Sequence, residues 1–415
     1  MAAKIRDNPG RLKRDLGMRV LHIGKFFAPF AGGIENFMFD LLADCARRGV
    51  VQACLVHESP GGHSSHRPRF DFLAAIKRVP LVAQVSYAPL SPGFGRALER
   101  MIADFRPDLL HLHLPNTSAF WVLFHRPARQ IPQVIHWHSD VVGPGLDFKL
   151  RALYPFYRPF EQALLKQAKA VIATSPPYLE SSTALRRWRD KCRVVPLGID
   201  PRRIRPNREQ PDWPVPGGNR LKVLAIGRLS RYKGFETLIR AAATVENCDV
   251  IIAGDGPHRR RLQQAIPDVA QARIRLAGGV SDHQRNRLLA ACDVLCLPSH
   301  NRAEAFGVVL LEAMAAGKPQ IACRVAGSGM SWVIEDGKSG WLVPPGDAAA
   351  LAALLHRLSC DPDRLRAGGR AAERRFTERF RIAAVAEAVV ALYEEILNPG
   401  HESVSGSDGR SIYGS

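Results

Sequence analysis

Short apolar runs and amphipathic helical patterns alternate along most of the chain. In the first half, runs typical of buried strands cover residues 18–23, 51–56, 109–113, 133–137 and 170–174. Apolar residues at helical spacing from Ile34 to Cys45 predict a helix that ends at Gly49. In the second half, strand patterns at 221–227, 249–253, 273–277 and 294–297 alternate with helical patterns at 235–244, 282–291 and 306–316. This alternation predicts two α/β domains with parallel sheets.

The length of the chain agrees with two domains, because 415 residues are about twice a typical domain. We expect a first domain at 18–200 and a second at 201–379, with an apolar helix within 380–397 crossing back to the first. Residues 1–17 and 398–415 have the composition of disordered segments.

Composition excludes several classes of protein. No run of 18 apolar residues is present, the basic N-terminus lacks an apolar signal region, and the eight cysteines are scattered without a C-x-x-C pair. We therefore expect a cytosolic protein that does not span a membrane. The formal net charge of +19 suits phosphorylated substrates, an anionic membrane surface or nucleic acid, but no nucleic-acid-binding motif accompanies it.

One segment mixes aromatic and basic residues, at positions 146–167. Such a composition favours the boundary between membrane and water. The pattern is interrupted by Pro155 and Pro159, so that a packed helical hairpin beneath an acceptor site is an equal alternative.

Polar side chains follow two strands of the first domain, where parallel sheets bind ligands. One strand ends at His113 with Asn116 beyond it, and His138 and Asp140 follow the next strand. These four residues are candidates for binding an acceptor or the transferred group. We expect His111 and His136 to point elsewhere, because strand side chains change face at every step.

Glycines, cations and carboxylates indicate a phosphate site between the domains. Gly32 and Gly33 stand where the chain turns into its first helix, which suits either a phosphate contact or a plain tight turn. Arg228 and Lys233 follow the first strand of the second domain. At the same edge Glu304 precedes the helix predicted at 306–316, which contains Glu312. A helix N-terminus attracts anions, whereas carboxylates accept hydrogen bonds from hydroxyls.

Four motifs in order carry a family resemblance: G-G-I-E at 32–35, G-R-x4-K-G at 227–234, A-G-D-G-P at 253–257 and E-x7-E at 304–312. Over residues 18–397 the chain resembles the retaining GT-B glycosyltransferases of family 4. The resemblance implies two Rossmann-like domains facing a cleft, with the nucleotide-sugar donor on the second, the acceptor on the first, and neither metal nor cofactor. The segments LHLHLPN and HWHSD further resemble the mannosyl- or rhamnosyltransferase branch that builds O-antigens and exopolysaccharides, whose members often use GDP-mannose.

The resemblance also implies roles for individual residues. Arg228 and Lys233 would hold the diphosphate, Glu304 the hydroxyls of the donor sugar, Glu312 the ribose, and His138 the transferred sugar. The implied donor-binding set is Gly32, Gly33, Arg228, Lys233, Gly254, Glu304, Phe306, Gly307, Val308 and Glu312. The implied catalytic set is Glu304, His138, Arg228 and Lys233, and the acceptor-side set is His113, Asn116 and Asp140.

We therefore expect a retaining hexosyltransferase that moves mannose from GDP-mannose onto a polyprenyl-diphosphate-linked saccharide at the inner face of the membrane. A transferase with a UDP-sugar or another donor and a different acceptor is one alternative. A nucleotide-sugar epimerase, which shares the architecture, is a second alternative. A non-catalytic basic protein that binds membranes or nucleic acid is a more distant alternative. The D-x-D pattern at Asp361 and Asp363 is expected to cap a helix rather than to bind a metal.

Overall fold

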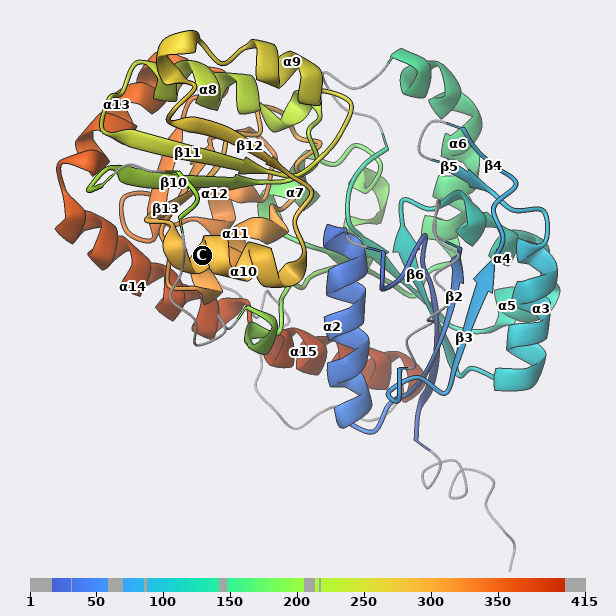
Figure 1. Ribbon diagram of the computed structural model, residues 1–415. Coiled ribbons are helices and arrows are strands. Elements are labelled where there is room, and N and C mark those ends of the chain that lie inside the picture. The colour runs from blue at the N-terminus through green and yellow to red at the C-terminus, as the bar shows by residue number, and fades with distance from the viewer. Residues whose placement is uncertain are drawn as a thin grey trace, which may run out of the picture.

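A computed structural model describes residues 17–30, 32–58, 70–85, 88–141, 148–204, 213–215 and 218–399. Residues 1–16 and 400–415 lie outside this set. The two segments expected to be disordered, 1–17 and 398–415, therefore fall almost entirely outside the described residues. Two α/β domains stand side by side in Figure 1, as the alternation of strands and helices predicts.

The first domain is built on a seven-stranded parallel sheet in the order β3-β2-β1-β6-β7-β8-β9. Its strands are β1 (Arg19–Ile23), β2 (Val51–His57), β3 (Ala75–Val79), β6 (Leu109–Leu114), β7 (Gln133–Trp137), β8 (Ala170–Ala173) and β9 (Cys192–Val194). A hairpin of β4 (Ala83–Val85) and β5 (Ala88–Leu90) stands apart. The helices of the first domain are α2 (Gly33–Arg47), α3 (Phe94–Phe105), α4 (Trp121–Phe124), α5 (Arg126–Gln130), α6 (Phe148–Gln167) and α7 (Pro176–Ser181).

The central strands of this sheet are buried on both faces. Val20 and Leu109 belong to the core shared with α2, whereas the adjacent Leu21 and Leu110 belong to the core shared with α3. Alternate residues of each strand therefore meet different helices, which explains why these strands read as continuous apolar runs.

The second domain repeats this plan with a six-stranded parallel sheet in the order β12-β11-β10-β13-β14-β15. Its strands are β10 (Leu221–Ile226), β11 (Cys248–Ala253), β12 (Ile274–Gly278), β13 (Val294–Leu297), β14 (Gln320–Cys323) and β15 (Gly340–Val343). Its helices are α8 (Phe235–Ala243), α9 (Arg259–Gln264), α10 (Asp282–Ala291), α11 (Val308–Ala315) and α12 (Met330–Val333). The bounds of α10 and β13 are those predicted, whereas the sequence patterns did not identify β3, β14 and β15.

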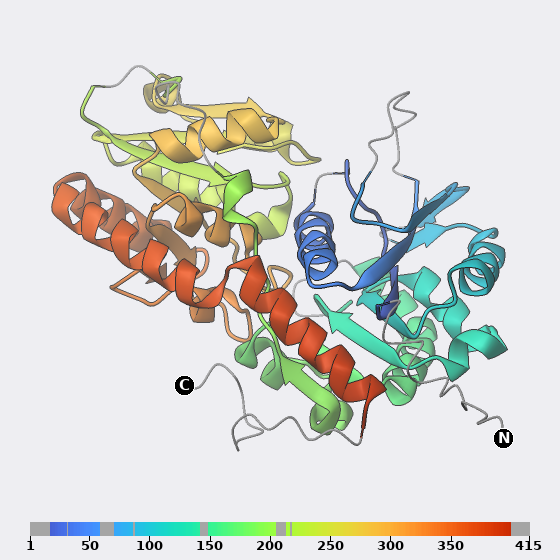
Figure 2. The same cartoon turned by 90° about the horizontal axis from the view of Figure 1, so that it is seen from below.

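Three helices end the described chain: α13 (Ala348–Ser359), α14 (Pro362–Arg379) and α15 (Ile382–Leu397). Figure 2 shows α14 along the second domain and α15 reaching the first. The Tyr393 hydroxyl of α15 meets Nδ1 of His111 in the first sheet, and Arg48 donates to the carbonyl of Ala383 at 2.7 Å. The predicted crossing of the C-terminal helix is thus confirmed. Asp361 caps α14 by accepting from the backbone N–H of Arg364 at 2.9 Å, as expected.

Two helix predictions need correction. The helix expected at 306–316 begins only at Val308, because Gly307 adopts a left-handed conformation with φ 85° at the cap position. The segment expected to break at Pro155 and Pro159 forms the single helix α6. Both prolines are exposed, so water can reach the backbone carbonyls whose helical hydrogen bonds they remove.

One arginine of the second domain clamps the first. Arg302 follows β13, and its Nη1 donates to Oδ2 of Asp140 at 2.6 Å. Its Nε donates to Ser181 Oγ at 2.9 Å, and its Nη2 donates to the carbonyl of Tyr178 at 3.2 Å. The guanidinium also lies 4.0 Å from the centre of the Tyr178 ring. One side chain thereby holds three residues of the opposite domain.

Replacing this arginine should loosen the contact between the domains. In Arg302→Met the Asp140 carboxylate, whose side chain is 7% exposed, loses its cation. We expect a loss of about 3 kcal/mol in the free energy of unfolding measured in urea, and a larger radius of gyration in small-angle X-ray scattering.

Arg324→Met is the matched control, because its ion pair with Asp336 is exposed and lies within one domain. We expect this control to lose less than about 1 kcal/mol. Equal unfolding curves for the two variants would contradict the clamp.

Candidate donor and acceptor site

The loops after β10 and β13 meet through a buried ion pair. Lys233 Nζ contacts Oε2 of Glu304, and each side chain is 12% exposed. Ser299 Oγ donates to the same carboxylate oxygen at 3.1 Å. Burial is the largest single effect on the pKa of Lys233 and lowers it. The charge of Glu304, the charge of Tyr232 and the hydrogen bond to Glu304 together outweigh burial, so the pKa is raised. Lys233 is therefore a fixed cation at the carboxyl edge of the second sheet.

Glycines allow these loops to pack closely. At Gly254, whose φ is 142°, an added Cβ would lie 2.0 Å from the carbonyl oxygen of Gly227. At Gly227 an added Cβ would lie 3.4 Å from Nζ of Lys233. The A-G-D-G-P and G-R-x4-K-G motifs thus form one packed unit that supports Lys233.

The N-termini of α2 and α11 come together between the domains. Gly32 and Gly307 occupy the N-cap positions, and a Cβ added at Gly33 would lie 3.5 Å from Cγ2 of Val308. Gly33 therefore lies against the second domain, and its contact with a phosphate stays a prediction. Both helices contribute partial positive charge at this point.

Two further cations lie near these helix ends. Burial is the largest effect that lowers the pKa of Lys25, and the charge of Arg228 lowers it further, while Glu35 opposes both. Arg228 of the second domain is therefore close enough to the first to act on Lys25 electrostatically. Cations from both domains and two helix N-termini make the junction suited to a diphosphate.

Glu312 lies deeper, in α11, and is 7% exposed. Burial raises its pKa despite the positive charge of Arg285, whose Nη1 lies 3.5 Å from its Oε1. Phe306 is buried as well and packs against Trp332 and Phe380, with ring centres 6.4 and 6.2 Å away. The contacts of Glu312 and Phe306 with a donor stay predictions.

The first domain contributes a group of five buried histidines, and here one expectation is wrong. His111 and His136 do not point away from His113 and His138: the ring centres of His111 and His113 are 4.5 Å apart, and those of His136 and His138 are 4.4 Å apart. Residues two apart on a strand share a face, so the alternation rule places each pair together. His22 of β1 completes the group.

The other two acceptor-side candidates have partners within the protein. Oδ1 of Asn116 accepts from the backbone N–H of Ser118 at 3.1 Å. Oδ1 of Asp140 accepts from Trp137 Nε1 at 2.8 Å and from Ser182 Oγ at 2.7 Å, while Oδ2 binds Arg302. Both side chains organise the carboxyl edge of the first sheet, and a contact with an acceptor stays a prediction.

Some residues of the site were absent from the sequence prediction. Lys25 directly follows the Gly24 turn after β1, so the strand-end argument that selected His113 would have selected it. Ser299 binds Glu304, and Arg302 binds Asp140. No sequence motif predicts either contact. Ser328 Oγ also donates to the backbone carbonyl of Glu304, at 2.6 Å.

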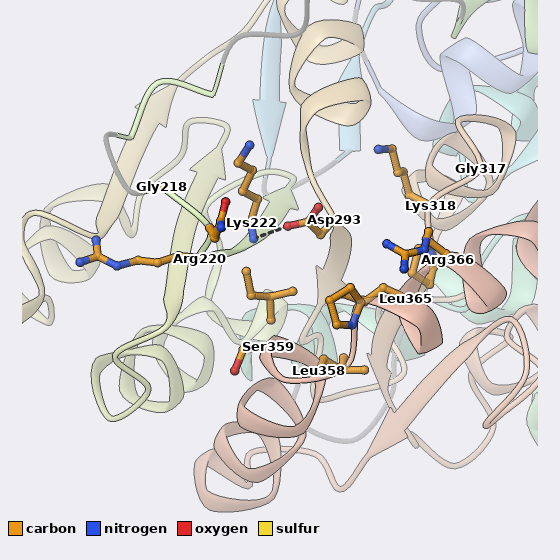
Figure 3. A pocket seen from close by; sticks show the side chains of 14 residues that line it. Gly218, Arg220, Lys222, Asp293, Gly317, Lys318, Leu358, Ser359, Leu365 and Arg366 are labelled. Atoms are coloured by element: carbon orange, nitrogen blue, oxygen red, sulfur yellow. Dashed lines mark hydrogen bonds between the residues drawn. The ribbon is translucent and has the colours of Figure 1, made fainter.

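A separate cavity of about 470 Å³ lies at the opposite edge of the second sheet (Figure 3). Its walls include Lys222 and Asp293, whose carboxylate accepts from the backbone N–H of Lys222 at 2.8 Å. These residues stand at the amino ends of β10 and β13, away from Lys233 and Glu304 at the carboxyl ends. This cavity is therefore not part of the candidate site.

Comparison with known proteins agrees with this geometry. Residues 32–198 match the model described as "Glycosyl transferase 4-like domain", and residues 208–375 match "Glycosyl transferases group 1". The lipopolysaccharide core biosynthesis glycosyltransferase LpsD of Rhizobium meliloti is 36% identical over 91% of this chain and 98% of its own. O-antigen chain mannosyltransferase C of Escherichia coli is 28% identical over 92% and 99%.

Among solved structures, sucrose-phosphate synthase from Thermosynechococcus elongatus superposes with a TM-score of 0.75 at 24% identity, covering 92% of this chain and all of that one. This likeness concerns the fold. The motifs, the two facing parallel sheets and the 36% identical relative together show that the chain belongs to the family of GT-B glycosyltransferases with group 1 and 4-like domains.

Proposed function

We propose that this glycosyltransferase moves a hexose, with mannose from GDP-mannose as the favoured donor, onto a polyprenyl-diphosphate-linked saccharide, with retention of the anomeric configuration. The observation that carries the proposal is the buried Lys233–Glu304 pair beside two helix N-termini. The names of the O-antigen mannosyltransferase and the lipopolysaccharide core relative support the sugar and the class of acceptor.

In this proposal the protein stabilises the leaving nucleoside diphosphate. Cleavage of the anomeric C–O bond places negative charge on the phosphate, and Lys233, Arg228 and the N–H groups at α11 offer charge and hydrogen bonds where it develops. A single well-placed donor of this kind contributes about 3 kcal/mol. These cations would supply the stabilisation without a metal ion.

Glu304 is proposed to hold hydroxyls of the donor sugar rather than to attack the anomeric carbon. A carboxylate nucleophile needs a free oxygen near that carbon. One oxygen of Glu304 already binds both Lys233 and Ser299. The other oxygen stays available for sugar hydroxyls. Because the family resemblance assigns Glu304 to those hydroxyls, we favour a front-face displacement in which the leaving phosphate takes the proton of the acceptor hydroxyl.

Removing either member of the ion pair should abolish most transfer. Lys233→Met and Glu304→Gln are each expected to lower kcat by roughly 100- to 1,000-fold, because each removes a charged contact to the donor. Transfer is measured with a panel of nucleotide sugars and a lipid-linked acceptor, and the anomeric configuration of the product is read by NMR.

Lys338→Met and Glu335→Gln are the controls, since they break an exposed Lys–Glu pair within the second domain. Wild-type activity in both site variants would remove the site assignment. Release of nucleoside diphosphate without any glycoside would favour the epimerase alternative.

We further propose that the protein binds the membrane surface through the α4–α6 patch, formed by Trp121, Phe124, Leu153, Phe156 and Phe160. These side chains are 39–76% exposed, and the rings of Phe124 and Phe160 are 6.0 Å apart. Arg126 of α5 and Arg151 and Arg158 of α6 are exposed as well, and α4, α5 and α6 lie on the same side of the first domain (Figure 1). Among the described helices, none is long and apolar enough to cross a bilayer. Aromatic groups with neighbouring cations suit an anionic interface.

Charge placed in the α4–α6 patch should release the protein from vesicles. The double variant Phe124→Asp/Phe156→Asp is expected to lose binding to phosphatidylglycerol vesicles in co-sedimentation, because two apolar anchors become anions facing anionic lipid. Val269→Asp is the control, as Val269 is 82% exposed on the second domain. Wild-type sedimentation of the double variant would contradict the proposal.

A further inference from the structure

Four buried polar side chains form one hydrogen-bonded row across the first sheet. Gln52 lies on β2, His22 on β1, His113 on β6, and His138 directly after β7, and these three strands and the end of β7 are neighbours in the sheet. None of the four is more than 4% exposed. The row joins Gln52 Oε1 to His22 Nε2 at 3.0 Å, His22 Nδ1 to His113 Nε2 at 3.2 Å, and His113 Nδ1 to His138 Nε2 at 3.1 Å.

The rings in this row meet edge to edge. The planes of His113 and His138 are 12° from parallel and their centres are 5.4 Å apart, farther than the 4.4 Å between the stacked rings of His136 and His138. Each contact therefore needs one N–H and one lone pair. A neutral imidazole has one of each, so the direction of the first bond determines all the others.

A backbone carbonyl sets that direction. Nε2 of Gln52 donates to the carbonyl of Leu42 in α2 at 2.5 Å, and a carbonyl can only accept. Oε1 of Gln52 therefore faces His22, which must carry its proton on Nε2 and accept at Nδ1. His113 then donates from Nε2 and accepts at Nδ1, and His138 donates from Nε2.

The histidines are neutral, as this reasoning requires. Burial lowers the pKa of His22 and that of His138 to about 3, and holds the pKa of His113 well below its usual range. Nδ1 of His138 is left with a lone pair, and it is buried without a hydrogen-bond partner among the described residues. Leaving a buried acceptor without a hydrogen bond is unfavourable, and a ligand hydroxyl would supply the missing bond.

We propose that Gln52, acting through His22 and His113, holds His138 in the tautomer whose Nδ1 accepts a hydrogen bond from a hydroxyl of the transferred sugar. Gln52, His22 and His113 are positioning residues in this view. The inference rests on the proposed hexosyl transfer and adds a selection rule: a donor sugar that lacks the hydroxyl, as a deoxyhexose does, leaves Nδ1 unpaired.

A metal ion is the competing explanation for the same cluster. His22, His111 and His113 bring three ring nitrogens within 4.8 Å of one another, and so do His113, His136 and His138. His113 belongs to both groups, yet each of its nitrogens already faces a nitrogen of a neighbouring ring at hydrogen-bond distance. A metal would have to break this row.

The tautomers can be read without any substrate. In protein labelled with ¹⁵N-histidine, two-bond ¹H–¹⁵N spectra should show His22, His113 and His138 with the proton on Nε2, each assigned by its loss in a single His→Asn variant. A proton on Nδ1 of His138 would overturn the proposal, as would one tightly bound metal ion per chain, found by mass spectrometry and lost in His113→Asn.

Gln52→Glu should reverse the row. A carboxylate at this position favours a charged His22 that donates from both nitrogens, so that His113 accepts at Nε2, and the proton of His138 moves to Nδ1. Gln133→Glu is the matched control, because Gln133 is 1% exposed in the same sheet but outside the row, where its Nε2 donates to the carbonyl of Ala128 at 3.3 Å. An unchanged His138 spectrum in Gln52→Glu would count against the proposal.

Gln52→Met provides a second test if the charged variant does not fold, since it removes the acceptor while keeping the side-chain length. Both tautomers of His138 should then appear, and a single Nε2–H form would overturn the role of Gln52.

Deoxy donors test the sugar contact itself. In the wild type, the deoxy donor that lacks the bound hydroxyl should have a kcat/KM roughly tenfold below that of the parent hexose. In Gln52→Met the difference in kcat/KM between these two donors should be smaller. Equal rates for every deoxy analogue in the wild type would overturn the sugar contact. Absence of turnover with every donor would contradict the proposed function. The NMR spectra would still test the order of tautomers in Gln52, His22, His113 and His138, because they need no substrate.

Discussion

The structure depends most on one pair of opposite charges held out of water, Lys233 and Glu304. They come from the loops after β10 and β13, which are neighbours in the sheet although β11 and β12 lie between them in the chain. Neither charge could be buried alone, because an uncompensated ion in a protein interior is strongly destabilising. The pair therefore orders both loops before a substrate arrives. In the proposed reaction the diphosphate meets a cation that is already in place.

The two domains supply different chemistry to their junction. The second provides Lys233, Arg228 and the N-terminus of α11, whereas the first provides the N-terminus of α2 and the row that ends at His138. Their alignment rests on two close contacts, the clamp of Arg302 on Asp140 and the approach of Gly33 to Val308. A Cβ at Gly33 would lie at van der Waals distance from Val308, so the two helix ends are directly adjacent.

Much of this arrangement could be predicted from sequence because it is local. Alternating strands and helices indicated both domains, and the strand ends indicated His138, Lys233 and Glu304. The local argument failed for His111. Side chains change face from one strand residue to the next, but His111 and His113 are two residues apart and therefore share a face. It also failed for α6, whose two prolines looked like breaks but are tolerated on an exposed helix. The pairing of Arg302 with Asp140 spans 162 positions, and only the packing of two complete domains brings it about.

The return of α15 to the first domain affects how the chain can fold as it leaves the ribosome. The first sheet is assembled from residues made early, yet the face that carries its histidines is covered in part by Tyr393, which is synthesised after the entire second domain. Until then the nascent first domain exposes an apolar surface next to α2. The second domain must therefore be translated before the first can be finished, which couples the completion of the first domain to the synthesis of the second.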